Sequence, residues 1–237
     1  MSSVPRFFIE ARLSETGQHV PLPPETARQV ATVLRLRPGD QVVLFNDGGP
    51  QWLAKLADVD RGATTVRLVE QQASRPSPPR GVTLCQALLK GEKMEWVLQK
   101  GTELGLAAFQ PVLSDRVIAR KSETPERWRR ILVEAAEQCG RVTIPRLLPP
   151  LPLDQVLRTQ ERTLLCWEDE HALSLLDALR SAPGDPLRIV VGPEGGFAPH
   201  EVERARAAST EVVSLGPLIL RAETAAIAAS TLALLTP

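Results

Sequence analysis

The sequence is poor in the residues that build metal sites and disulfides. Its three cysteines, Cys85, Cys139 and Cys166, are odd in number, lie far apart and form no Cys-x-x-Cys pair. They predict neither a disulfide framework nor a zinc site, and a reducing compartment fits them. The three histidines share no ligand spacing, so we expect no bound metal.

Net charge and long apolar runs are missing as well. The 28 basic residues balance 28 acidic ones, so no overall field draws the chain to a nucleic acid or a membrane. Any contact with a polyanion must therefore come from a local patch. The N-terminus lacks the pattern of a signal peptide, and the most apolar tail, residues 225–235, is too short to cross a bilayer. We expect a cytoplasmic protein without membrane contact.

The chain is predicted to form two domains, residues 1–72 and 73–237, because its pattern changes at a polar, proline-rich segment, residues 73–81. Before that segment, short strands bounded by turns surround a single helix at about residues 24–34. This pattern predicts a small β-barrel. Such a barrel serves either as a structural cap or as an RNA-holding module, and the two alternatives remain open. The predicted strands are residues 6–9, 41–45, 52–56 and 64–69.

The second domain alternates strands and helices, which predicts an α/β fold with a parallel sheet covered on both faces. Ligands of such sheets bind beyond the carboxyl ends of the strands. The proline-rich residues 145–152 are predicted to be a surface connection. The predicted strands are residues 82–88, 109–113, 163–167, 187–191 and 211–215, and the predicted helices are residues 92–104, 125–139, 173–180, 199–208 and 220–235.

Two Gly-Pro loops stand out at the ends of predicted strands. The first, GPEGGF at residues 192–197, follows an apolar strand, and its glycines allow a ligand to approach the backbone closely. It matches neither the dinucleotide nor the P-loop pattern, which disfavours NAD and ATP. Alone, it is also explained as a tight turn. The second loop, residues 215–220, offers backbone polar groups for an adenine edge between aliphatic walls, so the pair predicts one ligand pocket.

Arg221 and Glu223 follow the second loop and open a helix that is otherwise apolar. Charges at the start of a buried helix need a partner or a function. A mutual salt bridge is one interpretation, although a spacing of two residues does not favour it within a helix.

Several motifs together carry a family resemblance. GPEGGF, the LGPLILRAETAA run at 215–226, the KGEKMEWVLQKGTELG helix at 90–105, EAAEQCGR at 134–141 and VLRLRPGD at 33–40 resemble the bacterial 16S rRNA uracil-N3 methyltransferases of the SPOUT superfamily. The resemblance covers most of the chain. It implies a PUA-like β-barrel that helps to hold RNA, followed by a trefoil-knotted methyltransferase domain that binds S-adenosylmethionine and forms a homodimer. The implied substrate is 16S rRNA of the small ribosomal subunit.

The resemblance also places the cofactor against the two Gly-Pro loops, in agreement with the pocket predicted from the residues. The residues expected to bind S-adenosylmethionine are Gly192, Pro193, Glu194, Gly195, Gly196, Leu215, Gly216, Leu218, Ile219, Leu220 and Ala225.

Methylation of uracil N3 requires loss of the imide proton and stabilisation of the resulting anion. Arginine suits this anion because it stays protonated and can hydrogen-bond the flanking carbonyl oxygens, so Arg221 and Arg141 are the candidate catalytic residues. Glu223, or alternatively Glu194, could accept the proton. Release of the proton to bulk solvent is an equal alternative.

Basic residues near the predicted pocket and in the barrel are candidates for phosphate contacts. Such a run is usually a solvated helix face. Phe197 is a candidate for stacking on an extruded base, although packing beneath its own loop is the preferred interpretation. The predicted RNA-binding residues are Arg6, Arg35, Arg37, Arg116, Arg120 and Lys121.

Two other functions compete with this prediction. A methyltransferase of the same fold could act on another nucleotide or on tRNA. Alternatively, the chain could be a ribosome assembly factor that binds RNA and has lost the reaction. The intact loops disfavour loss of the pocket.

Overall fold

The computed structural model describes residues 4–60, 62–75, 78, 80–117, 125–181 and 186–236. The chain divides into two compact units. The first comprises Met1–Pro76 and Ala136–Ile144, and the second comprises Ser77–Ala135 and Pro145–Pro237. Each unit is described separately below.

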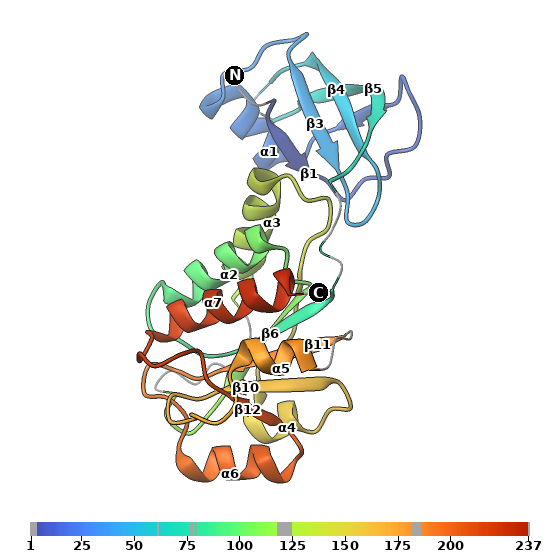
Figure 1. Cartoon of the computed structure of the whole chain (residues 1–237). Helices are drawn as coiled ribbons and strands as arrows, with labels where there is room; N and C mark the ends of the chain where they lie inside the picture. The colour runs from blue at the N-terminus through green and yellow to red at the C-terminus, as the bar shows by residue number, and fades with distance from the viewer. Residues whose placement is uncertain are drawn as a thin grey trace. The chain divides into compact units, whose positions relative to one another are not determined.

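The first unit is a curled, mixed five-stranded sheet with the order β1-β3-β4-β5-β2 (Figure 1). β1 pairs with β3 in parallel, and the remaining pairs are antiparallel. Its core includes Phe7, Ile9, Val30, Trp52 and Leu68. The strands are β1 (Arg6–Phe8), β2 (His19–Pro21), β3 (Gln41–Phe45), β4 (Gln51–Asp58) and β5 (Thr65–Gln72). The sheet agrees with the four predicted strands, and β2 is an additional one.

The helix predicted at about residues 24–34 forms in two parts. α1 (Pro24–Arg28) is α-helical with proline in its first turn, where no backbone N–H is needed. The next turn, Gln29–Val33, is π-helical, and the Leu34 N–H donates to Gln29 O at 3.0 Å. Periodicity does not distinguish this wider turn from an α-helix.

A distant segment completes the first unit. The last residues of α3 (Glu126–Cys139) and the loop that follows belong to it. The Glu137 carboxylate accepts the Phe8 N–H at 2.9 Å, and Arg6 donates to the Gly140 and Arg141 carbonyls at 3.2 and 3.3 Å. Hydrogen bonds with residues far along the chain therefore hold β1 in addition to its pairing with β3.

The second unit is built on a parallel sheet with the order β12-β10-β11-β6-β7-β8, and β9 also pairs with β7. β6 is buried along its whole length, as expected for a central strand between helical layers. The strands are β6 (Val82–Ala87), β7 (Ala108–Leu113), β8 (Arg146–Leu147), β9 (Leu151–Pro152), β10 (Arg162–Cys166), β11 (Leu187–Val191) and β12 (Glu211–Val213). The helices other than α3 are α2 (Lys93–Leu104), α4 (Leu153–Leu157), α5 (Leu175–Ser181), α6 (Pro199–Ala207) and α7 (Ala222–Leu235).

The α/β prediction for this unit is confirmed, with a correction at residues 145–152. This proline-rich segment is not only a surface connection, because β8 and β9 each add a two-residue ladder to β7. Ladders this short at an edge tolerate proline and leave no periodicity in the sequence. α2 and α7 pack against each other (Figure 1).

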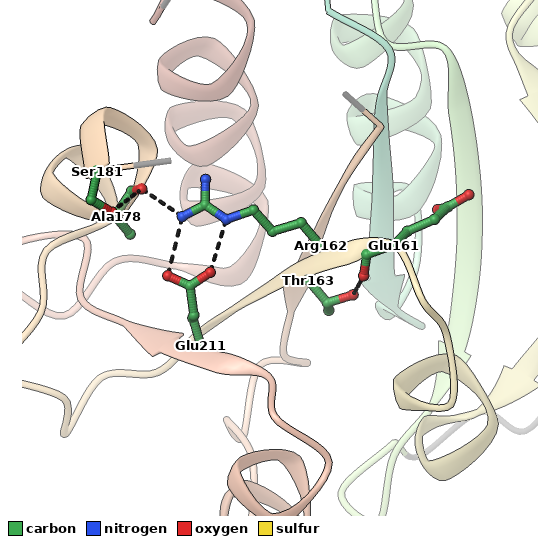
Figure 2. A network of polar contacts seen from close by, with 6 residues as sticks. All are labelled: Glu161, Arg162, Thr163, Ala178, Ser181 and Glu211. Atoms are coloured by element: carbon green, nitrogen blue, oxygen red, sulfur yellow. Dashed lines mark hydrogen bonds and ion pairs between the residues drawn. The ribbon is translucent and has the colours of Figure 1, made fainter. Parts of the chain in front are cut away.

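A bidentate ion pair joins two strands at the amino end of the sheet. Figure 2 shows the Arg162 guanidinium facing the Glu211 carboxylate, with Nε–Oε1 and Nη2–Oε2 distances of 2.8 and 3.1 Å. Nη2 also donates to the Ala178 carbonyl of α5 at 2.5 Å. One side chain therefore ties β10, β12 and α5 together, at the end of the strands opposite to the predicted pocket.

Replacing Arg162 with methionine should lower the free energy of unfolding by about 1–2 kcal/mol, because the Glu211 carboxylate and the Ala178 carbonyl lose charged donors. Urea denaturation measures this change. Arg204→Met is the matched control: the Arg204–Asp154 pair is 3.0 Å long with side chains 46% and 48% exposed, and should contribute less than about 1 kcal/mol. Equal losses in the two variants would contradict the assignment.

Candidate functional site

A cavity of about 340 Å³ lies at the carboxyl ends of β10, β11 and β12. The order of the strands places β10 between β11 and β12, although the chain passes through β10 first. One of the later strands, β11, therefore lies on one side of β10, and the other, β12, lies on its other side. A crevice opens at the carboxyl ends of these strands, where the connections that follow them diverge. The three segments that follow these strands form its walls.

The two Gly-Pro loops meet in this cavity, as the sequence predicts. Every residue expected to bind the cofactor lines it, namely Gly192, Pro193, Glu194, Gly195, Gly196, Leu215, Gly216, Leu218, Ile219, Leu220 and Ala225. Leu218 and Ile219 are 77% and 85% exposed, which is unusual for large aliphatic side chains. Phe197 is 2% exposed and packs beneath the first loop rather than facing a substrate.

The third wall of the cavity, which follows β10, was not predicted from the sequence. Trp167 and Glu168 line the cavity together with Cys166, the last residue of that strand. Burial raises the pKa of the Cys166 thiol to about 12, so it is protonated at neutral pH and a poor nucleophile. The strand itself was predicted, and the rule that ligands bind at carboxyl ends could have identified Glu168.

One side of the 192–197 loop is held through Glu194. Its Oε1 accepts the Lys90 N–H at 3.1 Å and lies 3.3 Å from the Lys93 ammonium. Burial opposes ionisation of this carboxyl, but hydrogen bonds from the backbone N–H groups of Glu194 and Lys90, together with Lys93, outweigh it. The pKa of Glu194 is therefore lowered from its usual value.

The other side of the loop is held by the turn after β7. Arg116 Nη1 donates to the Gly195 carbonyl at 2.6 Å. The fully buried Glu201 accepts the Asp115 N–H at 3.0 Å and the Ala198 N–H at 2.8 Å, which connects this turn to the start of α6. Arg116 was predicted to contact RNA, and in this structure its guanidinium contacts the predicted cofactor loop.

Only one glycine of the first loop has a left-handed backbone. Gly196 has φ of +66°, and a Cβ added there would collide with Glu168 Oε1. A Cβ at Gly195 would meet the Arg116 side chain at 3.5 Å, an ordinary contact. Gly196 is therefore the position in this loop where the backbone conformation favours glycine, whereas the Glu168 carboxylate, at the end of an exposed side chain, can move aside.

A larger groove of about 690 Å³ shares two residues, Lys93 and Arg221, with the cavity. α2, α3 and α7 form its walls, and Trp96, which is 43% exposed, lines it. The candidate catalytic residues Arg221 and Glu223 both line this groove, and Arg221 also lines the cavity. The side chain of Glu223 is 16% exposed, and its Oε2 lies 3.5 Å from Lys93 Nζ.

The remaining candidates that the structure describes belong to the first unit. The Arg141 guanidinium donates to Thr143 Oγ1 at 3.0 Å, and burial is the main cause that lowers its pKa. Arg6 donates to Gln51 Oε1 at 2.6 Å and lies over the Phe45 ring. Arg35 and Arg37 are exposed. Arg120 and Lys121 fall outside the described residues.

The described residues contain neither a cluster of metal ligands nor a membrane-spanning helix. No group of three His, Cys, Asp or Glu side chains in residues 4–117 and 125–236, apart from the undescribed gaps, is arranged to hold a metal ion. No helix in the same part of the chain is long and apolar enough to cross a membrane.

Known proteins are similar to this chain in both sequence and fold. The model of the RNA methyltransferase domain matches residues 76–234, and that of the RNA methyltransferase PUA domain matches residues 25–69. The chain belongs to the RNA methyltransferase family. The family resemblance found in the sequence is thus confirmed, as is the PUA-like nature of the first sheet.

Several ribosomal RNA small subunit methyltransferases are similar in sequence to this protein over most of its length. The ribosomal RNA small subunit methyltransferase E of Bacillus subtilis is 32% identical over 93% of this chain and 92% of its own length. The protein of that name from Synechocystis is 39% identical over 81% of this chain, and the match spans 65% of the relative. The crystal structure of the Neisseria gonorrhoeae protein bound to S-adenosyl methionine has a TM-score of 0.87, 33% identity and coverage of 96% of this chain and 95% of that one.

Gly196→Ala should destabilise the protein by about 1–2 kcal/mol, because alanine is strained at a positive φ. The Glu168 carboxylate, at the end of an exposed side chain, can move away from the added methyl group and should add little to this cost. Gly195→Ala is the matched control in the same loop and should change stability little. Urea denaturation of both variants checks the difference, and similar stabilities would show that the loop adjusts freely.

The stability contributed by Glu194 should depend on pH. A carboxyl group whose pKa is lowered in the folded state stabilises the protein above its unfolded pKa, and this contribution is lost as the pH falls through the folded pKa. Glu194→Gln should therefore be less stable than wild type at pH 7, and the gap should narrow in acid. Urea denaturation across this pH range measures the gap; a constant gap would exclude the ionised carboxylate as its cause.

Proposed function

We propose that this chain uses S-adenosylmethionine to methylate N3 of a uracil in 16S rRNA of the small ribosomal subunit. The cavity formed by the two Gly-Pro loops supports this proposal most directly, because relatives named as small-subunit rRNA methyltransferases include one with S-adenosyl methionine bound. The size of the cavity and the residues that line it also fit such a cofactor.

The size of the cavity and its apolar lining suit a ligand with an adenine base. Its volume of about 340 Å³ lies within the range for small-molecule sites. A Cβ added at Gly216 would meet nothing within 4 Å, so its backbone is open to a base edge, and Leu215 and Leu220 supply aliphatic walls. Two acidic residues, Glu168 and Glu194, and two basic ones, Lys93 and Arg221, also line the cavity. We propose that the loop residues predicted above bind the cofactor.

The residues of the chain would position the uracil and its charge. When bound, the cofactor supplies a methyl group on a sulfonium, which is already a good leaving group. Arg221, at the junction of cavity and groove, would stabilise the uracil anion by hydrogen-bonding its carbonyl oxygens. Glu223 would accept the N3 proton. Arg141, in the first unit, is proposed as a further catalytic residue. Exclusion of water by the cavity would strengthen each of these interactions.

Other features of the family belong to the same proposal. We propose a trefoil-knotted second domain, a division into residues 1–72 and 73–237, and a homodimer in the cytoplasm, without a metal. The basic residues Arg6, Arg35, Arg37, Arg116, Arg120 and Lys121 are proposed to contact rRNA. For Arg6 and Arg116, the intramolecular contacts described above would have to coexist with RNA binding.

Incubation with labelled cofactor and unmodified small ribosomal subunits, followed by nucleoside mass spectrometry, tests the reaction. We expect label on N3-methyluridine. Label on tRNA, or on another position, would favour a methyltransferase with a different substrate. If calorimetry detects no binding of S-adenosylmethionine, both methyltransferase hypotheses are excluded, and an RNA-binding assembly factor is the alternative that is left.

Arg221→Ala should reduce turnover about a hundredfold, equivalent to about 2.7 kcal/mol, the effect of losing one donor to a developing anion. Affinity for S-adenosylmethionine should change far less, because the cavity is built mainly from backbone and aliphatic groups. Single-turnover kinetics and calorimetry separate the two quantities. Turnover close to that of wild type would assign Arg221 a structural role.

A further inference from the structure

Lys93, the first residue of α2, joins the two sides of the candidate site. Its ammonium lies 3.3 Å from Glu194 Oε1, in the first Gly-Pro loop, and 3.5 Å from Glu223 Oε2, in the first turn of α7. It also lines both the cavity and the groove. The Lys93 ammonium thus contacts both the first Gly-Pro loop and α7, at the boundary between the cavity and the groove.

The two carboxylates depend on this cation to different degrees. Glu194 Oε1 also accepts the Lys90 N–H, so it keeps a donor if the ammonium is removed. Glu223 Oε2 is buried and has no hydrogen bond within the part of the chain that the structure describes. Lys93 lies within ion-pair distance of it. Removing the cation would leave a buried carboxylate oxygen without compensation, a much larger penalty than the loss of one contact among several.

We propose that Lys93 is a positioning residue for the methyl transfer, which acts by holding the Glu223 carboxylate in the wall of the groove, next to the boundary with the cavity that Lys93 and Arg221 line. This inference rests on the proposed function, in which Glu223 accepts a proton there. Lys93 itself need not touch the cofactor or the uracil. Its position is set by α2, whose packing against α7 brings the ammonium and Glu223 together (Figure 1).

A purely structural role for Lys93 makes a different prediction. If Lys93 served only to fix the first Gly-Pro loop through Glu194, its loss would weaken binding of S-adenosylmethionine and leave turnover at saturation intact. If it positions Glu223, its loss lowers kcat and leaves cofactor affinity nearly unchanged. The split between kcat and the cofactor Kd therefore distinguishes the two roles.

The test compares Lys93→Met, which keeps an apolar stem but removes the charge, with Lys93→Arg, which keeps the charge. Lys100→Met is the matched control: Lys100 lies on the same helix, its side chain is 35% exposed against 38% for Lys93, and it pairs with Glu103 at 2.8 Å. Calorimetry gives the Kd for S-adenosylmethionine. Kinetics on unmodified small subunits give kcat and KM, and circular dichroism checks folding.

We expect Lys93→Met to lower kcat about tenfold to a hundredfold, the effect of a misplaced catalytic group, with the cofactor Kd within about threefold of wild type. Lys93→Arg should restore most of kcat, and Lys100→Met should match wild type. Wild-type kcat in Lys93→Met, or a loss confined to the cofactor Kd, would overturn the proposal. A wild-type protein that does not methylate the subunit would instead remove the proposed function.

A double-mutant cycle identifies the carboxylate through which Lys93 acts. Lys93→Met and Glu223→Gln should be strongly non-additive in kcat, because either change alone breaks the same interaction. Lys93→Met and Glu194→Gln should be nearly additive. Coupling to Glu194 in place of Glu223 would overturn the proposal even if Lys93→Met lowers kcat.

Discussion

The candidate site depends on external support for the loop at residues 192–197, whose backbone has left the sheet. A loop that exposes glycines to a ligand gives up the ladder hydrogen bonds that a strand would provide, and its carbonyls need other donors. Gln86, fully buried in the neighbouring β6, donates from Nε2 to the carbonyls of Val191 and Gly192, at 3.4 and 3.1 Å. Arg116 donates a hydrogen bond to the Gly195 carbonyl from the other side of the loop. The loop is thus pre-organised by side chains from two other strands and their connections.

Pre-organisation matters because binding to a mobile loop would first have to order it. The ion pair of Glu194 with Lys93 and the hydrogen bonds of the buried Glu201 carboxylate add to these donors, so the loop is fixed through both backbone and side chains. The second Gly-Pro loop differs. Leu218 and Ile219 are largely exposed there, and Gly216 has open space around its Cβ position. The cavity therefore combines one firmly held wall with one wall whose apolar surface is free to be covered by a ligand or a second chain.

Much of this arrangement was predictable from local sequence. The strands and helices of the second unit follow apolar runs and turn residues, and the rule that ligands bind at carboxyl ends brought the two Gly-Pro loops together. Lys100 and Glu103 pair with each other at 2.8 Å, and Gly105 ends α2 in the left-handed conformation, as their spacing suggests. Elements of two or three residues, such as β2, β8 and β9, are too short to leave a period, and the π-helical turn after α1 has the same apolar spacing as an α-helix.

The functional residues that were not predicted from the sequence escaped prediction for one physical reason. Lys93 and Gln86 act on partners about a hundred positions further along the chain, and a sequence does not say which atoms the fold brings within 3.5 Å. Gln86 lies in a run that predicts a fully buried strand, and its Nε2 donates locally to the carbonyl of the next residue, Ala87, at 3.0 Å. Yet a buried polar residue in such a run must find hydrogen bonds elsewhere, because burial without them costs about 1–3 kcal/mol. A glutamine in a central parallel strand is therefore itself a sign that an adjacent strand ends in an irregular loop, and here that loop forms the wall of the candidate site.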